Sequence, residues 1–150
     1  MNPAGNFVIR VYGLVMNGKN EVLVSDEFRM NMKMTKFPGG GLHYGEGTID
    51  CLIREFAEEC NGQEIENIRH YYTTDYFQKA LFYENHQLMS IYYLVDLKMP
   101  QCFDISTQPF DFEEMKDGGQ SFRWLNLKEA APDMLTFPVD RLVLEKLKNF

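Results

Sequence analysis

Long apolar runs and a leader-like N-terminus are both missing from this sequence of 150 residues. No apolar run reaches the roughly 18 residues that a membrane-spanning helix needs. Residues 1–6 contain neither the basic nor the apolar region of a signal peptide. These absences predict a cytoplasmic protein that has no membrane partner.

Basic charge is also scarce, since the net charge is −7 and the isoelectric point is near 4.9. Binding to a nucleic-acid backbone requires a stripe of Lys and Arg side chains, and no such stripe is visible. We therefore expect no nucleic-acid polymer as a partner. An acidic protein can still act on a small anionic substrate, provided that metal ions neutralise the charge where the two meet.

Cysteine is limited to Cys51, Cys60 and Cys102, an odd number that follows no zinc-binding spacing. If Cys51 and Cys60 share a helix, they stand about 13 Å apart along its axis, which is too far for a disulfide. Buried free thiols are expected, as in a reducing compartment.

Hydrophobic residues make up 45% of the chain, which is typical of a globular protein, and we expect residues 1–150 to form one domain. The patterns predict an α/β or α+β layered fold with a mixed sheet. Glycines make residues 37–47 a predicted loop, and residues 101–120 are acidic and irregular. Strands are predicted at residues 7–16, 21–25, 65–74, 87–97 and 121–127, and a closing helix at residues 140–147.

A helix is predicted from Thr48, which is a plausible N-cap, to Asn61-Gly62, which favour the left-handed conformation that ends helices. Its predicted apolar stripe is Ile49, Leu52, Ile53, Phe56 and Cys60.

The same helix brings Glu55, Glu58 and Glu59 together on one side, rotated away from the predicted apolar stripe. Like charges at these spacings destabilise a helix, whereas crowded carboxylate oxygens suit Mg²⁺ or Mn²⁺. A solvated acidic face is the commoner explanation of such a pattern. The triple glycine that precedes the helix, together with Arg54 and Glu46, favours a functional site instead.

The segment from Gly40 to Gly62 resembles the Nudix box, whose pattern is Gly-x5-Glu-x7-Arg-Glu-U-x-Glu-Glu-x-Gly-U, with U an aliphatic residue. Gly40 and Glu46 take the first two fixed positions, and residues 54–59 take the Arg-Glu-U-x-Glu-Glu core, with Phe56 at the U position. Asn61 replaces the pattern's glycine and Gly62 its last apolar residue. Neither departure changes a charged position.

The resemblance implies a Nudix-type α/β/α sandwich with a mixed sheet. It also implies Mg²⁺-dependent cleavage of a diphosphate linkage in a small molecule, a nucleoside diphosphate joined to another moiety, and it is compatible with a homodimer. The implied metal ligands are Glu55, Glu58 and Glu59, with the Gly39 carbonyl as an addition. By the same resemblance Arg54 orients the carboxylates and Glu46 holds Arg54, although this pair equally well pins the loop to the helix.

The general base is not fixed by the motif, because family members differ in where they keep it. Glu55 is one candidate, and Asp111, Glu113 and Glu114 lie in the acidic stretch where relatives carry an extra carboxylate. For each of these three a solvated loop charge is the simpler explanation, and Glu114 is retained as the candidate. His43 is expected to be exposed, and the substrate-binding residues stay unassigned. A nucleobase platform or plain core packing would each suit the aromatic residues Tyr71, Tyr72, Tyr76, Phe77, Phe82 and Tyr83.

A non-catalytic Nudix domain that senses a nucleotide or nucleotide sugar is the alternative function. Such domains typically lose box carboxylates, whereas this chain keeps Glu55, Glu58 and Glu59 along with Arg54. A purely structural helix in a protein-interaction module is a third hypothesis, which the glycine loop and the spacing disfavour.

Overall fold

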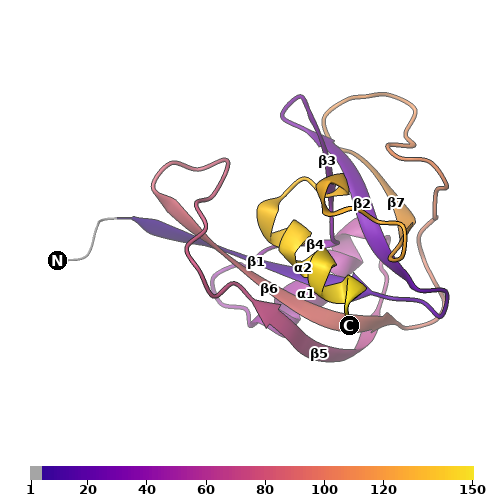
Figure 1. The fold of residues 1–150 in the computed structure, drawn as a ribbon, viewed down its shortest axis with the longest axis horizontal. Helices are drawn as coiled ribbons and strands as arrows, with labels where there is room; N and C mark the ends of the chain where they lie inside the picture. The colour runs from indigo at the N-terminus through magenta and orange to yellow at the C-terminus, as the bar shows by residue number, and fades with distance from the viewer. Residues whose placement is uncertain (1–4) are drawn as a thin grey trace.

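The computed structural model describes residues 5–150, which form two β-sheets and two α-helices (Figure 1). Strands β1 to β4 span Asn6–Val15, Glu21–Arg29, Met32–Lys36 and Gly39–Gly41, and helix α1 spans Thr48–Glu59. Strands β5 to β7 span Ile65–Thr73, His86–Leu97 and Gly119–Asn126, followed by a short 3₁₀ turn at Pro132–Met134 and helix α2 at Pro138–Lys148. No helix in this part of the chain is long and apolar enough to cross a membrane.

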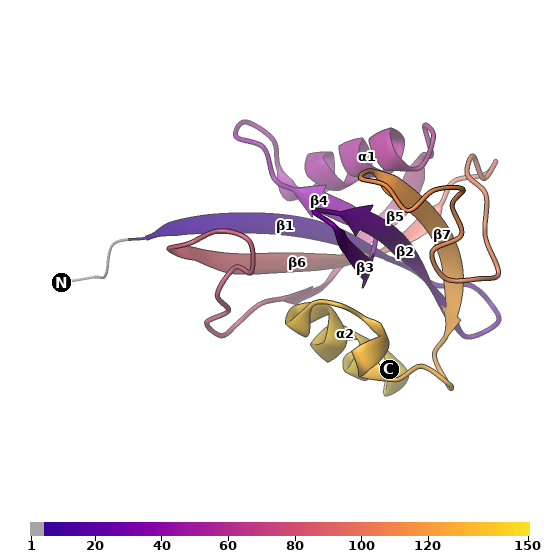
Figure 2. The same cartoon turned by 90° about the horizontal axis from the view of Figure 1, so that it is seen from above.

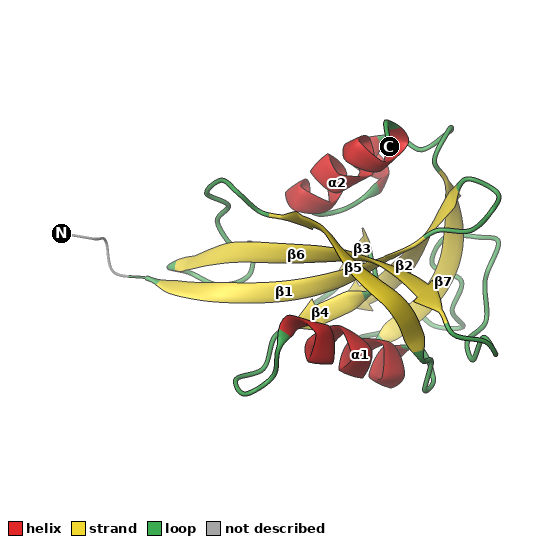
Figure 3. Ribbon diagram, turned by 90° about the horizontal axis from the view of Figure 1, so that it is seen from below, coloured by secondary structure: helices red, strands yellow, loops and turns green. Residues whose placement is uncertain are grey.

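The larger sheet is mixed, as predicted, with strand order β4-β1-β6-β5. Its central strands β1 and β6 run parallel, and β4 and β5 join them antiparallel. The smaller sheet, β3-β2-β7, is antiparallel throughout. Helix α1 covers one face of the assembly and α2 the opposite face, which confirms the expected α/β/α layers (Figures 2 and 3).

Strand β1 divides the core, because alternate side chains of a strand point to opposite faces. Val11 and Val15 pack with the buried side of α1, whereas Tyr12 and Leu14 pack with α2. The expected burial on both faces therefore holds for the second half of the strand. Its first half extends beyond the helices, and Phe7 is 63% exposed there.

The triple glycine was predicted to lie in a loop, but it forms strand β4, which pairs with β1. A Cβ atom at Gly39 would lie 2.7 Å from the Tyr12 Cα, and Gly39 has a φ of +146°. Glycine is needed here because the two backbones approach closely, a reason that composition alone does not distinguish from loop flexibility. Strand β3 was not predicted, and β2 continues past the predicted end at Ser25 to Arg29.

Helix α1 begins after Gly47, which is the N-cap in place of the predicted Thr48. The Thr48 hydroxyl is instead 2.5 Å from the Tyr93 hydroxyl, and the Asp50 carboxylate accepts a 3.0 Å hydrogen bond from the Gly47 amide. The predicted stop is confirmed, since Asn61 and Gly62 have φ values of 54° and 81°.

The buried stripe of α1 is rotated relative to the prediction. Leu52, Phe56 and Cys60 are fully buried as expected, and Cys51 joins them, but Ile49 and Ile53 are 44% and 46% exposed. The helix therefore turns its Glu55 side towards the sheet, so Glu55 is only 9% exposed. The prediction that the carboxylates point well away from the apolar stripe is wrong for this residue. Cys51 and Cys60 are buried free thiols, as predicted, and Cys102 is free and half-buried.

Candidate active site

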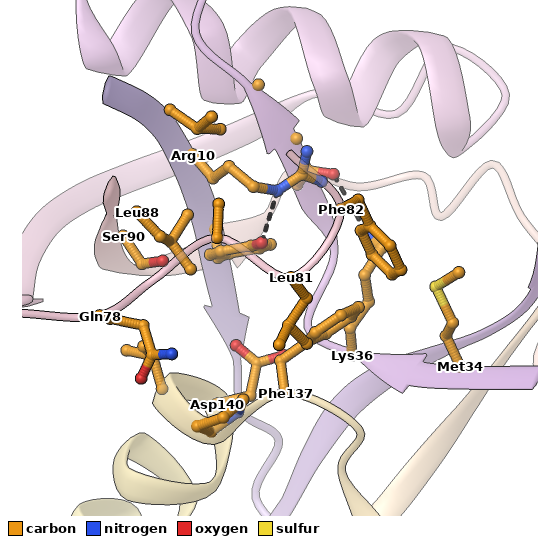
Figure 4. Close-up of a pocket in the computed structure, with 18 of the residues that line it drawn as sticks. Arg10, Met34, Lys36, Gln78, Leu81, Phe82, Leu88, Ser90, Phe137 and Asp140 are labelled. Atoms are coloured by element: carbon orange, nitrogen blue, oxygen red, sulfur yellow. Dashed lines mark hydrogen bonds between the residues drawn. The ribbon is translucent and has the colours of Figure 1, made fainter. Parts of the chain in front are cut away.

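A cavity of about 320 Å³ lies beside β4 and α1, and the carboxylates of Glu55 and Glu59 form part of its wall. The opposite wall comes from the start of α2 and from the segment of residues 78–83 (Figure 4). The cavity therefore joins the Nudix-like segment to parts of the chain that the motif does not include.

Arg54 is the centre of the polar network next to this cavity. Its guanidinium donates to both carboxylate oxygens of Glu46, at 2.7 and 3.0 Å, and to the Gly41 carbonyl at 2.9 Å. It also donates to Glu55 at 3.0 Å and to Glu58 at 3.2 Å. The predicted Glu46–Arg54 pair is thus present, and hydrogen bonding to Arg54 lowers the pKa of Glu46 to about 2. This geometry fixes the orientation of two box carboxylates and also pins the loop to the helix.

Glu55 lies against Gly40, the first glycine of the motif. A Cβ atom at Gly40 would lie 2.7 Å from Glu55 Oε2, so a side chain at residue 40 would displace the carboxylate. This contact, together with Arg54, holds a nearly buried carboxylate at the cavity wall.

Glu59 is the box carboxylate with an unsatisfied oxygen. Its Oε2 atom is inaccessible to solvent and has no hydrogen-bond partner within residues 5–150. Burial raises the pKa of Glu59, and the nearby charge of Lys36 partly opposes this increase. A buried carboxylate oxygen without a donor is energetically costly, and a cation would satisfy it.

Glu58 differs from the other two, because its side chain is 58% exposed. Across residues 5–150, no three His, Cys, Asp or Glu side chains are already arranged around one point as metal ligands. The donor set nevertheless fits a hard divalent cation, since it consists of carboxylate oxygens, one of them orphaned and another cradled by glycine.

The Gly39 carbonyl, an expected further ligand, accepts a 3.2 Å hydrogen bond from the buried Lys36 ammonium. Lys36 also donates to the Phe37 carbonyl at 3.4 Å and forms a 3.0 Å ion pair with Glu27. Burial by itself would lower the pKa of Lys36, but the charges of Glu27 and Glu59 outweigh burial and raise it. Neither Lys36 nor Glu27 was identified from the sequence as a site residue. The sequence offered little signal for them, because the two strands also carry Glu21, Asp26, Arg29 and Lys33.

Glu114 lies apart from the other candidates. Its side chain is 72% exposed, 3.7 Å from the Lys116 ammonium, and neither Glu114 nor Asp111 nor Glu113 lines the cavity. His43 is exposed, as expected. Of the six aromatic residues considered from the sequence, only Phe82 and Tyr83 line the cavity.

Three further cavity residues were not identified from the sequence as site residues. The rings of Tyr12 and Tyr92 stack with centroids 5.1 Å apart, and the Tyr92 hydroxyl donates a 2.5 Å hydrogen bond to Asp140 Oδ1. Asp140 Oδ2 is buried and has no partner in the described part of the chain. Burial raises the pKa of Asp140 to about 6. These residues give the far end of the cavity an aromatic wall and one buried acidic group.

Arg10 lies between the two ends of the cavity. Its Nε atom donates a 2.7 Å hydrogen bond to the Tyr12 hydroxyl. Burial alone would lower the pKa of Arg10, but interactions with Tyr12, Glu55 and Asp140 outweigh it and raise the pKa. The guanidinium is therefore charged.

Known proteins share the domain and the fold of this chain. A family model described as the NUDIX domain matches residues 6–147. A NUDIX hydrolase from Nitrosomonas europaea superposes with a TM-score of 0.68 at 17% identity, covering 97% of this chain and 89% of that one. A MutT NUDIX hydrolase from Burkholderia pseudomallei gives 0.65 at 16% identity, with coverages of 93% and 97%. At such identities the structural likeness shows the fold. Among curated proteins none matches the sequence significantly.

Proposed function

This chain belongs to the NUDIX domain family of pyrophosphohydrolases, and we propose that it uses Mg²⁺ to cleave the diphosphate linkage of a nucleoside diphosphate joined to another moiety. The observation that carries this proposal is the placement of Glu55 and Glu59 on the cavity wall. One of these carboxylates is held against Gly40 and the other has an oxygen without a partner. A solvated acidic face would have neither property.

The residues that would hold the metal are Glu55, Glu58 and Glu59, with the Gly39 carbonyl as an additional ligand. A bound divalent cation neutralises the charge of the diphosphate and lowers the pKa of water. A carbonyl has two lone pairs, so the hydrogen bond from Lys36 leaves the Gly39 oxygen one more. Glu58 would have to exchange its contact with Arg54 for the metal.

Arg54 and Glu46 act as positioning residues in this proposal. The two hydrogen bonds from Arg54 to Glu46 fix the guanidinium plane, and the fixed guanidinium in turn orients Glu55. Such support lowers the cost of assembling the site when the metal and the substrate bind.

The hydrolytic step joins a water oxygen to one phosphorus atom and breaks the bond from that phosphorus to the bridging oxygen. Glu55 is the proposed acceptor of the water proton, because it already lies at the cavity wall. Glu114 remains the alternative base. Turnover that survives in E114Q but falls by about 10²- to 10⁴-fold in an E55Q variant that still binds Mn²⁺ supports Glu55 as the base, whereas a comparable fall in E114Q supports Glu114.

The test is a panel of nucleoside triphosphates, dinucleoside polyphosphates and nucleotide sugars, each offered with Mg²⁺. A coupled phosphatase reports phosphate release, and a chelator supplies the metal-free control. We expect hydrolysis of at least one compound, abolished by the chelator. Nucleotide binding without hydrolysis across the panel would favour a sensor domain instead.

A further inference from the structure

Four cations line the cavity: Arg10, Arg29, Lys36 and Lys79. The three donors of the Lys36 ammonium have three protein acceptors, namely Glu27 and the carbonyls of Phe37 and Gly39. Arg29 is paired with Glu27 at 3.3 Å and its side chain is 52% exposed. Lys79 is exposed at the rim.

Arg10 differs from these three cations because it is partly buried and mostly unpaired. Its Nε atom is fixed by the Tyr12 hydroxyl, whereas its two terminal nitrogens have no hydrogen-bond or ion-pair partner among residues 5–150. In Figure 4 the guanidinium reaches from β1 into the cavity towards Phe82. A guanidinium has five N–H donors, so four of them remain available to a ligand.

The surroundings of Arg10 place its guanidinium beside Glu55, one of the proposed metal ligands. Its Nη1 atom lies 4.0 Å from the position that a Cβ of Gly41 would occupy, which leaves space next to strand β4. The charge of Glu55 acts on it from that side, and the charge of Asp140 acts from the far end of the cavity. A substrate whose phosphates lie at Glu55 and whose other part extends towards Asp140 would pass Arg10.

We propose that Arg10 is a substrate-binding residue whose terminal nitrogens hold the non-bridging oxygens of the substrate's diphosphate. This inference rests on the proposed function, because it takes the metal carboxylates to mark the phosphate position. A planar guanidinium whose Nε atom is fixed presents its two terminal nitrogens in the geometry of a phosphate group. An anion bound to these nitrogens would accept hydrogen bonds from their unpaired N–H donors. Tyr12 is the positioning residue that orients the Arg10 guanidinium.

The test measures binding of methylenediphosphonate, a non-hydrolysable diphosphate, in the presence of Mg²⁺ by calorimetry. R10Q should bind about 10- to 100-fold more weakly than wild type, because hydrogen bonds to charged groups are lost. R10K keeps the positive charge but loses the planar guanidinium, and Y12F removes the hydroxyl that fixes Arg10 Nε. Both variants should therefore lose less affinity than R10Q. R29Q, a cavity arginine that is already paired, is the matched control and should bind as wild type.

Kinetics on a panel substrate give the second measurement. Because Arg10 would hold the diphosphate in both ground and transition states, R10Q should raise KM by a similar factor and change kcat little. The melting temperature of each variant controls for folding, and R10K replaces R10Q if the glutamine variant does not fold. Affinity within twofold of wild type in R10Q, or an equal loss in R29Q, would overturn the assignment of Arg10. If the Arg10 assignment fails in this way while the wild-type enzyme hydrolyses a panel compound, the proposed function still holds.

Discussion

The carboxylate of Glu55 takes the space beside Gly40 that a side chain would need, because a Cβ atom there would lie 2.7 Å from Glu55 Oε2. The first glycine of the motif and the first glutamate of its catalytic core are therefore in direct contact, although fourteen residues separate them in the sequence. This contact explains in steric terms why a glycine stands at residue 40.

Replacing Gly40 by alanine should displace Glu55, so G40A should lose turnover and about 1–3 kcal/mol of unfolding free energy. Kinetics and urea denaturation measure the two effects. Gly18 is the matched control, since a Cβ there meets nothing within 4 Å, and G18A should stay within about 0.5 kcal/mol of wild type. A G40A enzyme with normal turnover would show that the position of Glu55 does not matter.

Arg54 offers a test of positioning. R54K retains the charge but cannot make the paired hydrogen bonds to Glu46, so Glu55 and Glu58 lose their orientation. The Mn²⁺ concentration for half-maximal activity should rise about 10- to 100-fold, while the melting temperature changes little. R69K is the control, because Arg69 is exposed, donates a 2.6 Å hydrogen bond to the Asn67 carbonyl and lies 3.9 Å from Asp96, away from the cavity. If R54K needs the same Mn²⁺ concentration as wild type but is less stable, Arg54 only holds the loop to the helix and does not position the carboxylates.

Phe56 tests the rotation of α1. The ring is fully buried and packs so closely on Gly13 that a Cβ there would lie 2.6 Å from the ring. F56A should lower the free energy of unfolding by about 3–5 kcal/mol. I53A, one turn away but 46% exposed, should cost far less. Equal losses in the two variants would mean that the helix has a different face buried.

Asp140 makes stability depend on pH. Burial raises its pKa in the folded protein from the ordinary 3.8 to about 6, so the folded state holds a proton that the unfolded state releases. The stability that this proton supports is present below about pH 4 and is lost as the pH rises through about 6. The loss is on the order of 3 kcal/mol.

The control for this pH effect is D140N, which keeps an acceptor for the Tyr92 hydroxyl but does not titrate. Urea denaturation between pH 4 and 8 should show the wild type losing stability relative to D140N as the pH increases. Parallel curves for the two proteins would contradict an elevated pKa at Asp140.

The motif half of the site was predictable, because Glu46, Arg54 and Glu55 belong to one stretch of fixed spacing. Their contacts follow from helical winding and a short loop. The orientation of α1 was not predictable from apolar spacing, since Ile49 and Ile53 fit the helical stripe as well as Cys51 does. Packing against Val11, Val15 and Val95 decides between them.

The other half of the site comes from residues far apart in the sequence. Arg10, Lys36 and Asp140 meet only because β1 pairs with β4 and α2 packs over the same sheet. A single buried charge in a strand or a helix indicates neither its partner nor the cavity that it faces. Long-range pairing supplies that information, and sequence periodicity does not contain it.

Mn²⁺ binding and turnover in E59Q test most directly whether Glu59 belongs to a metal site. The fold should persist, because glutamine removes a charge that burial disfavours. E66Q, an exposed glutamate on β5, serves as the control. If Glu59 is a metal ligand, E59Q should lose at least about 100-fold in Mn²⁺ affinity and in metal-dependent turnover, whereas E66Q should be unchanged. Wild-type metal binding and turnover in a folded E59Q would contradict this assignment.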